Sequence, residues 1–113
     1  MSFENVMTHM PITCSQTVPF YSDPGHGWAK VHVDHLADYG VLEKITPYSY
    51  QRGSWVYLEE DCDLSTFVQA ARAHGVGITF KEMKPANNES RIRSYDRYRT
   101  PSGTVYQYQF NAA

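Results

Sequence analysis

The sequence lacks any hydrophobic run long enough to cross a bilayer, and no apolar secretory segment follows its polar N-terminus. Cysteine is scarce as well. The chain holds Cys14 and Cys62, with neither the CxxC spacing of redox motifs nor the spacing of metal ligands. These absences favour a cytoplasmic protein with reduced thiols and no membrane contact.

The chain also has little net charge. Its formal charge of −2 argues against a simple basic coat for nucleic acid. The charge is uneven along the sequence, however. Residues 1–63 carry nine acidic and three basic side chains, whereas residues 64–113 carry three acidic and seven basic ones. The two segments form separate charged faces or pair with each other, and the sequence leaves both outcomes open.

Internal repeats and long linkers are absent too. A length of 113 residues is typical of one domain with its own core. We therefore expect residues 1–113 to form a single domain, with residues 1–10 and 111–113 frayed at its ends.

Alternating apolar residues and turn signals predict the strands. Pro11 and Pro19 bracket a strand over about 12–18 and favour an edge position, because proline cannot donate to a sheet. Gly53 supplies the positive φ that a hairpin turn needs. Further strands are expected over 28–33, 45–51, 54–59, 76–80 and 104–110, with a polar, flexible loop over 84–90.

Two helices are predicted. Asp34 suits the N-cap of a short helix over 35–39, and Asp63 suits the N-cap of the best helix, 64–74. Apolar residues recur along this second helix at i, i+3, i+4 and i+7, which predicts one buried stripe formed by Leu64, Phe67, Val68 and Ala71. The expected fold class is α+β, with a mostly antiparallel sheet of five or six strands and two short helices packed on one face.

Nine tyrosines are the unusual feature of the composition. Tyrosine combines an apolar ring with a polar tip, so it is favoured at half-buried surfaces and interfaces. A row of four aromatic residues on two neighbouring strands suits a recognition surface: Tyr48, Tyr50, Trp55 and Tyr57. The four form one exposed face or pack beneath helix 64–74, depending on the hairpin register.

His26 lies between two glycines in the loop that runs from Asp23 to Trp28. The flexible backbone there can bring the imidazole close to a partner, and histidine acts as an acid, a base or a ligand near neutral pH. Asp23 is close enough in sequence to orient it. The alternative is a plain turn whose histidine sits in solvent or packs on Trp28.

Four carboxylates gather before helix 64–74, at Glu59, Glu60, Asp61 and Asp63. Acids are stabilised at a helix start by the helix dipole and by capping, which is a sufficient structural role. The same acids also suit acid–base chemistry or a negative patch for an arginine-rich partner.

Neither cysteine nor the remaining histidines make a stronger site. Cys62 lies where a helix start stabilises a thiolate, and a pair with His26 is the one nucleophile arrangement that the sequence suggests. A small buried hydrophobe is the preferred interpretation of Cys62. His32 and His35 have metal-ligand spacing, but the strand-to-helix break at Asp34 spoils their geometry. We therefore expect no metal and no cofactor.

The basic segment 91–99 interleaves arginines with tyrosines. On a strand, alternation would turn one set of side chains to the same face, namely Arg91, Arg93, Tyr95, Arg97 and Arg99. Arginine forks match phosphate oxygens and tyrosines stack on bases, so this face suits a phosphate-bearing ligand. A solvated edge strand protected by charge is the equal alternative.

Three motifs together resemble a group of small uncharacterised proteins encoded by bacteriophages, prophages and plasmids. They are Asp-Pro-Gly-His-Gly-Trp at 23–28, Tyr-Ser-Tyr-Gln at 48–51 and Tyr-Leu-Glu-Glu-Asp-Cys-Asp at 57–63. The resemblance covers roughly residues 20–95. It implies a bacterial or phage cytoplasmic setting and carries over no catalytic residue.

The leading hypothesis is a non-enzymatic binding protein of mobile-element origin. Its partner would be a host protein or ribonucleoprotein complex, and inhibition of a host defence complex, of anti-CRISPR or anti-restriction type, is the familiar precedent. One alternative is a small-molecule or nucleotide binder that uses the Gly-His-Gly loop and the arginines. Another is a small enzyme centred on His26. Self-association as a homodimer is compatible with the exposed aromatics.

Overall fold

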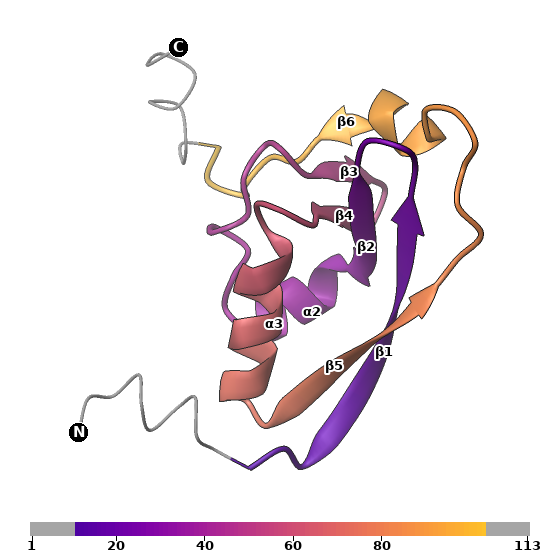
Figure 1. Ribbon diagram of the computed structural model, residues 1–113. Helices are drawn as coiled ribbons and strands as arrows, with labels where there is room; N and C mark the ends of the chain where they lie inside the picture. Colours follow the sequence, from indigo (N-terminus) through magenta and orange to yellow (C-terminus); the bar gives the residue numbers. More distant parts are fainter. Residues whose placement is uncertain (1–10, 104–113) are drawn as a thin grey trace.

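The computed structural model describes residues 11–103, and Figure 1 shows their arrangement. The expected strand over 104–110 and the expected fraying of 1–10 and 111–113 lie outside the described residues. In chain order the elements are β1 (Cys14–Ser22), β2 (Gly27–His32), α2 (Val33–Asp38), β3 (Tyr50–Arg52), β4 (Trp55–Glu59), α3 (Leu64–Ala73), β5 (Val76–Glu82), the 3₁₀ helix η1 (Arg91–Ser94) and β6 (Asp96–Arg97).

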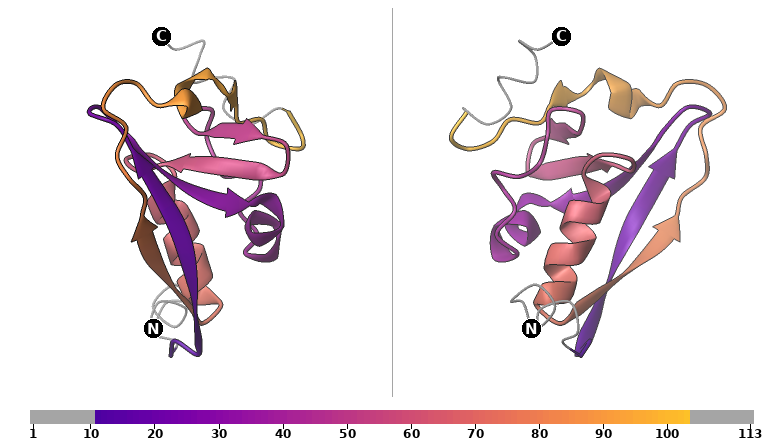
Figure 2. Two further views of the ribbon diagram at one scale, coloured as in Figure 1. Left: turned by 90° about the vertical axis from the view of Figure 1, so that its right-hand side faces the viewer. Right: turned by 60° about the vertical axis from the view of Figure 1, so that its left-hand side comes forward.

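The strands form one six-stranded sheet in the order β5-β1-β2-β4-β3-β6. Every neighbouring pair is antiparallel except β1 and β5, which run parallel. The two views of Figure 2 show α3 running beside the ribbon that β1 and β5 form. The predicted α+β class, with a mostly antiparallel sheet and two helices, is confirmed.

The middle of the sheet is buried on both faces. Successive side chains of a strand point to opposite sides, and in β2 and β4 side chains of both sets are buried. In β4, Val56 and Leu58 pack with residues of both helices in one core, which we call the helix-side core. Tyr57 lies between them in sequence and belongs to a second cluster, which we call the aromatic core. The aromatic core comprises Trp28, Tyr50, Tyr57 and Ile92, with Tyr21 and Tyr95 packed against it.

The hairpin register decides where the row of four aromatic residues lies. Tyr50 pairs directly with Tyr57, so both side chains lie on the same face of the sheet. That face is opposite the helix-side core, and what covers it is Ile92 of η1. The four aromatics are therefore neither one exposed face nor packed beneath α3. Tyr50 and Tyr57 are buried, whereas Tyr48 is 58% exposed and Trp55 is 41% exposed.

The prediction that the first strand forms a sheet edge is wrong. β1 lies between β5 and β2, and β5 forms the edge with Phe80 exposed. Proline is tolerated in β1 because the strand pairs with β5 along residues 14–20 but with β2 only along residues 20–22. Pro19 thus has a partner strand on one side only. Self-association through an open edge stays a prediction.

The start of α2 also differs from the prediction. The N-cap is His32 rather than Asp34, since the His32 ring nitrogen Nδ1 lies 3.1 Å from the amide of Asp34 and accepts its hydrogen bond. The helix therefore begins at Val33. At its other end Gly40 has φ +72°, and the amide of Val41 donates to the Leu36 carbonyl at 2.9 Å, which closes the helix in a Schellman motif.

Two predicted strands are shorter than expected. Of the segment 45–51, only the residues from Tyr50 onward belong to a strand. The amide of Thr46 donates a hydrogen bond to the Asp63 side chain instead of to a neighbouring strand. The segment 91–99 forms η1 and the two-residue β6 instead of one long strand. A 3₁₀ turn places Ile92 in the aromatic core, where it is 3% exposed. The predicted common face of arginines from 91 to 99 is therefore wrong.

Candidate functional site

A cleft of about 420 Å³ opens on the aromatic side of the sheet. It brings together motifs that are far apart in the sequence, and it is lined by His26, Trp28, Tyr48, Tyr50, Glu59, Asp61, Cys62, Arg93 and Arg97. Of the candidate residues from the sequence, Trp55, Tyr57, Glu60, Arg91 and Arg99 do not line this cleft. It therefore combines aromatic walls with charged groups of both signs.

Asp23 organises the loop that carries His26. One carboxylate oxygen accepts hydrogen bonds from the amides of Gly25 at 2.9 Å and His26 at 3.0 Å, and the other accepts from the amide of Ser90 at 2.9 Å. Arg93 adds a bidentate ion pair at 2.7 and 2.9 Å. Asp23 thus fixes the loop backbone; the partner of the His26 imidazole is a different carboxylate.

The Asp23–Arg93 ion pair also shows how the acidic and basic segments meet. The Asp23 side chain is fully buried, and the Arg93 guanidinium together with the three amides holds the pKa of that carboxyl well below its usual range. The guanidinium also lies over the Trp28 ring, 5.5 Å from its centroid. At this point the two oppositely charged segments pair, and Arg93 is not a free cation.

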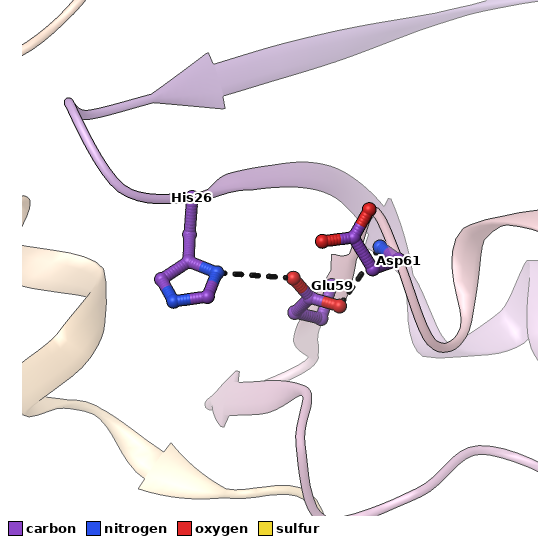
Figure 3. Close-up of side chains that lie close together, drawn as sticks. All are labelled: His26, Glu59 and Asp61. Carbon is purple, nitrogen blue, oxygen red and sulfur yellow. Dashed lines mark hydrogen bonds and ion pairs between the residues drawn. The ribbon is translucent and has the colours of Figure 1, made fainter.

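The partner of His26 is Glu59, at the end of β4. Figure 3 shows the ring facing this carboxylate, with Nδ1 3.3 Å from Oε1. The other oxygen, Oε2, accepts from the amides of Asp61 at 2.8 Å and Cys62 at 2.9 Å. Glu59 is only 6% exposed, so the tight turn that leads into α3 is built around a buried carboxylate. One ligand atom each of His26, Glu59 and Asp61 lie within 4.8 Å of one another.

Asp63 is the N-cap residue of α3, as the sequence predicted, but its side chain makes no capping hydrogen bond. The side chain is buried instead. It accepts hydrogen bonds from the amide and hydroxyl of Thr46, and from the Ser49 hydroxyl at 2.5 Å. The Ser49 oxygen in turn accepts from the amide of Glu59 at 2.9 Å. Burial raises the pKa of Asp63, although these donors oppose the shift.

Sequence reasoning missed this buried network. Thr46 and Ser49 carry no motif, and both contact Asp63 across more than a dozen residues of chain. The available signal was the turn-forming Thr46-Pro47 pair inside a segment that otherwise resembles a strand. The four carboxylates before α3 therefore divide into two buried groups, Glu59 and Asp63, and two exposed ones, Glu60 and Asp61.

Cys62 differs from both of its interpretations. The side chain is exposed at the cleft and is not a small buried hydrophobe. Partial desolvation and the adjacent Glu59 carboxylate raise the pKa of the Cys62 thiol to about 11. The thiol is therefore protonated near neutral pH, which contradicts the prediction of a stabilised thiolate.

Arg97 is exposed and lines the cleft. Its guanidinium lies over the Tyr50 ring, 4.7 Å from the centroid, and donates to the Pro47 carbonyl at 3.3 Å. Tyr48 lines the same cleft and is more than half exposed. A stacked arginine and an exposed tyrosine together form the accessible rim of the cleft.

A second cleft of about 400 Å³ borders the aromatic core at Tyr21, Tyr57 and Tyr95. It is lined by Tyr21, Lys30, Tyr57, Ala86, Glu89, Ser90, Arg91 and Tyr95. Two of the predicted site residues, Arg91 and Tyr57, thus belong here, apart from His26. Trp55 is outside both clefts, and the Lys30 ammonium lies 4.5 Å from its ring centroid.

His32 and His35 do not converge. His32 caps α2, and His35 stacks on Tyr39 with ring centroids 6.4 Å apart.

No family model, curated protein or solved structure matches the chain. The resemblance of residues 20–95 to proteins of mobile elements stays a prediction. Within residues 11–103, no helix has the length and apolar character that crossing a membrane requires.

Proposed function

We propose that this chain is a non-enzymatic binding protein and that the cleft around His26 and Arg97 is its recognition site. The observation that supports the proposal is the composition of the cleft. Aromatic rings and an arginine, which supply most binding hot spots, lie beside charged groups of both signs. Tyr48 and Arg97 are the accessible anchors, because both are exposed at the cleft.

The proposed partner is a host protein or ribonucleoprotein complex, as the sequence-based hypothesis holds. A segment carrying an aromatic or basic side chain suits the cleft, since the rings offer stacking surface and Asp61 offers a negative charge. Inhibition of a host defence complex of anti-CRISPR or anti-restriction type is the specific form of this proposal, and the resemblance to proteins of mobile elements supports it.

Affinity capture from bacterial lysate tests the proposal. We expect the wild-type chain to retain a partner at a fixed stoichiometry and the double variant Tyr48→Ala/Arg97→Ala to lose it. Trp55→Ala is the matched control, because Trp55 is an exposed aromatic outside the cleft. Loss of the partner with Trp55→Ala but not with the double variant would place recognition elsewhere. A measured turnover without any partner would contradict a binding protein altogether.

A small-molecule ligand is the second candidate, and the size of the cleft favours it. Clefts of about 300–1,000 Å³ are typical of small-molecule sites. A phosphate group fits less well, because the amides of Gly25 and His26 already donate to Asp23. A thermal-shift panel decides the point, since a ligand at 100 times its Kd stabilises a protein by about 2.7 kcal/mol. A panel without any shift argues against this candidate.

The enzyme alternative centred on His26 keeps one observation in its favour. His26 lies 3.3 Å from the Glu59 carboxylate in a cleft, which is the arrangement of an oriented general base. Cys62 is not an activated nucleophile beside it, however, because the raised pKa keeps the thiol protonated near neutral pH. Turnover that is lost with His26→Gln and kept with Cys62→Ser would favour this alternative.

A further inference from the structure

We infer that His26, Glu59 and Asp61 form a binding site for one divalent transition-metal ion in the cleft. The inference goes beyond the proposed function, since it concerns the chain alone and holds with or without a partner. It also revises the expectation, drawn from the sequence, that the chain binds no metal. The three residues come from the β1–β2 loop, the end of β4 and the turn before α3.

The distances are close to those that an ion requires. One ligand atom from each residue lies within 4.8 Å of the others. Two ligands bound at about 2.1 Å from the same ion in tetrahedral geometry are about 3.4 Å apart. His26 Nδ1 and Glu59 Oε1 are already 3.3 Å apart, and the exposed Asp61 side chain must move by about 1 Å to complete the set. Figure 3 shows the three side chains around one common space.

The supporting contacts of Glu59 are those of an oriented ligand. Its Oε2 is held by the amides of Asp61 and Cys62, whereas Oε1 faces the His26 ring and has no amide donor among the described residues. Hydrogen bonds to one oxygen fix the carboxylate and leave the other oxygen for an ion. Asp61 contributes to this arrangement twice, through its amide and through its side chain.

The charge balance of the cleft favours a cation. Arg93 is neutralised by Asp23, so Glu59 and Asp61 are opposed by Arg97 and by a histidine that is charged only when protonated. Glu59 is more than nine-tenths buried, and a buried carboxylate needs a compensating charge. A divalent ion supplies that charge without a proton on His26.

A separate observation concerns a buried donor of a residue that lines the cleft. The indole N–H of Trp28 is buried and has no acceptor among residues 11–103. Trp28 also lines the cleft, and its ring lies 6.1 Å from that of His26. An unpaired buried donor is unfavourable, and an oxygen-bearing ligand or an ordered water in the cleft would satisfy it.

The donor set defines the class of ion. An imidazole with two carboxylates suits Zn²⁺, Mn²⁺, Co²⁺ or Fe²⁺, whereas Mg²⁺ and Ca²⁺ prefer oxygen ligands alone. Three protein ligands also leave coordination positions open, as in sites that bind a water or a ligand atom. An anionic ligand group bound there would lie in the same cleft as Arg97.

Isothermal titration of the full chain, freed of any tag and treated with chelator, tests the inference. We expect Zn²⁺ and Mn²⁺ to bind at one ion per chain and Mg²⁺ to bind far more weakly. His26→Gln and Asp61→Asn should each weaken Zn²⁺ binding at least tenfold. Glu60→Gln is the matched control, because it removes an exposed carboxylate from the same turn, one residue before Asp61, and should leave the Kd unchanged.

Three results would overturn the site. The first is the absence of Zn²⁺ and Mn²⁺ binding to the wild-type chain, which leaves His26 with its Glu59 contact alone. The second is unchanged binding by Asp61→Asn, and the third is an equal loss with Glu60→Gln, which indicates diffuse attraction. Partner capture in the presence of chelator is scored separately, so failure of the metal site and failure of the binding function remain distinguishable.

Discussion

Two buried carboxylates hold the cleft in place, and their environments shift their pKa values in opposite directions. Asp23 has an arginine and three amide donors, so its charged form is favoured. Asp63 has hydroxyl and amide donors but no cation among the described residues, and desolvation dominates. One carboxylate therefore stabilises the fold in its charged form at neutral pH, while the charge of the other carries a cost.

The lowered pKa of Asp23 predicts a loss of stability in acid. Its contribution is present above the unfolded-state pKa of about 3.9 and fades as the pH falls toward the lower folded-state pKa. Asp23→Asn should cost about 1.5–3 kcal/mol at pH 7, and the difference from wild type should shrink below about pH 4. Urea unfolding across pH checks this. Asp38→Asn, at an exposed carboxylate, should show no such trend.

The raised pKa of Asp63 predicts the opposite trend. Its contribution is fully present below the unfolded-state pKa of about 3.9 and is lost as the pH rises through the folded-state pKa. Asp63→Asn should therefore remove a gain in stability that wild type shows on acidification from pH 7 toward pH 4. Asp63→Ala should cost about 1–3 kcal/mol by leaving the Thr46 and Ser49 donors unpaired. A wild-type curve parallel to that of Asp63→Asn would contradict the assignment.

At the scale of elements, glycines with positive φ set the turns, and they differ in what surrounds them. Gly53 has φ +59°, and a Cβ added there would meet no atom within 4 Å. Gly75 has φ +78°, and a Cβ there would meet the Thr13 hydroxyl at 3.0 Å. Gly53→Ala should cost about 1–2 kcal/mol from backbone strain alone, and Gly75→Ala should cost more. Chemical denaturation measures both. Equal losses would show that the contact at Thr13 relaxes freely.

Elements decided by neighbouring residues were predictable. The apolar stripe of α3 and the turn at Gly53 depend on residues within one helix or one hairpin, and both are confirmed. The strand expected over 45–51 begins only at Tyr50, because the amide of Thr46 donates instead to Asp63, which is 17 residues away. A hydrogen bond between residues so far apart in the chain is not revealed by the periodicity of the sequence.

The candidate site was predictable in its parts but not in its assembly. His26, Glu59 and Arg97 were each singled out by residue type and local spacing. Their meeting in one cleft depends on the pairing of β2 with β4 and on the path of residues 91–97 across the aromatic core. The buried Asp23–Arg93 ion pair joins residues 70 apart, so it too depends on the tertiary fold and could not be predicted from local spacing.

The whole molecule has two cores on opposite faces of one sheet, and they should respond to mutation independently. Ile45 is fully buried in the helix-side core and Ile92 is 3% exposed in the aromatic core. Ile45→Val and Ile92→Val should each cost about 0.5–1.5 kcal/mol. The double variant should lose the sum within about 0.5 kcal/mol, because the two residues belong to separate core clusters. A larger deviation in urea unfolding would mean that the sheet transmits strain between its faces.

The position of β1 has a consequence for the order in which the chain folds. Along residues 14–19 its strand partner is β5, and the Thr17 and Thr79 hydroxyls that meet across this pair are 62 residues apart. Contacts of such long separation are slow to form. On the ribosome, these residues of β1 wait for a strand that emerges 62 residues later. The interval during which the nascent chain presents an unpaired strand is therefore set by the rate of translation.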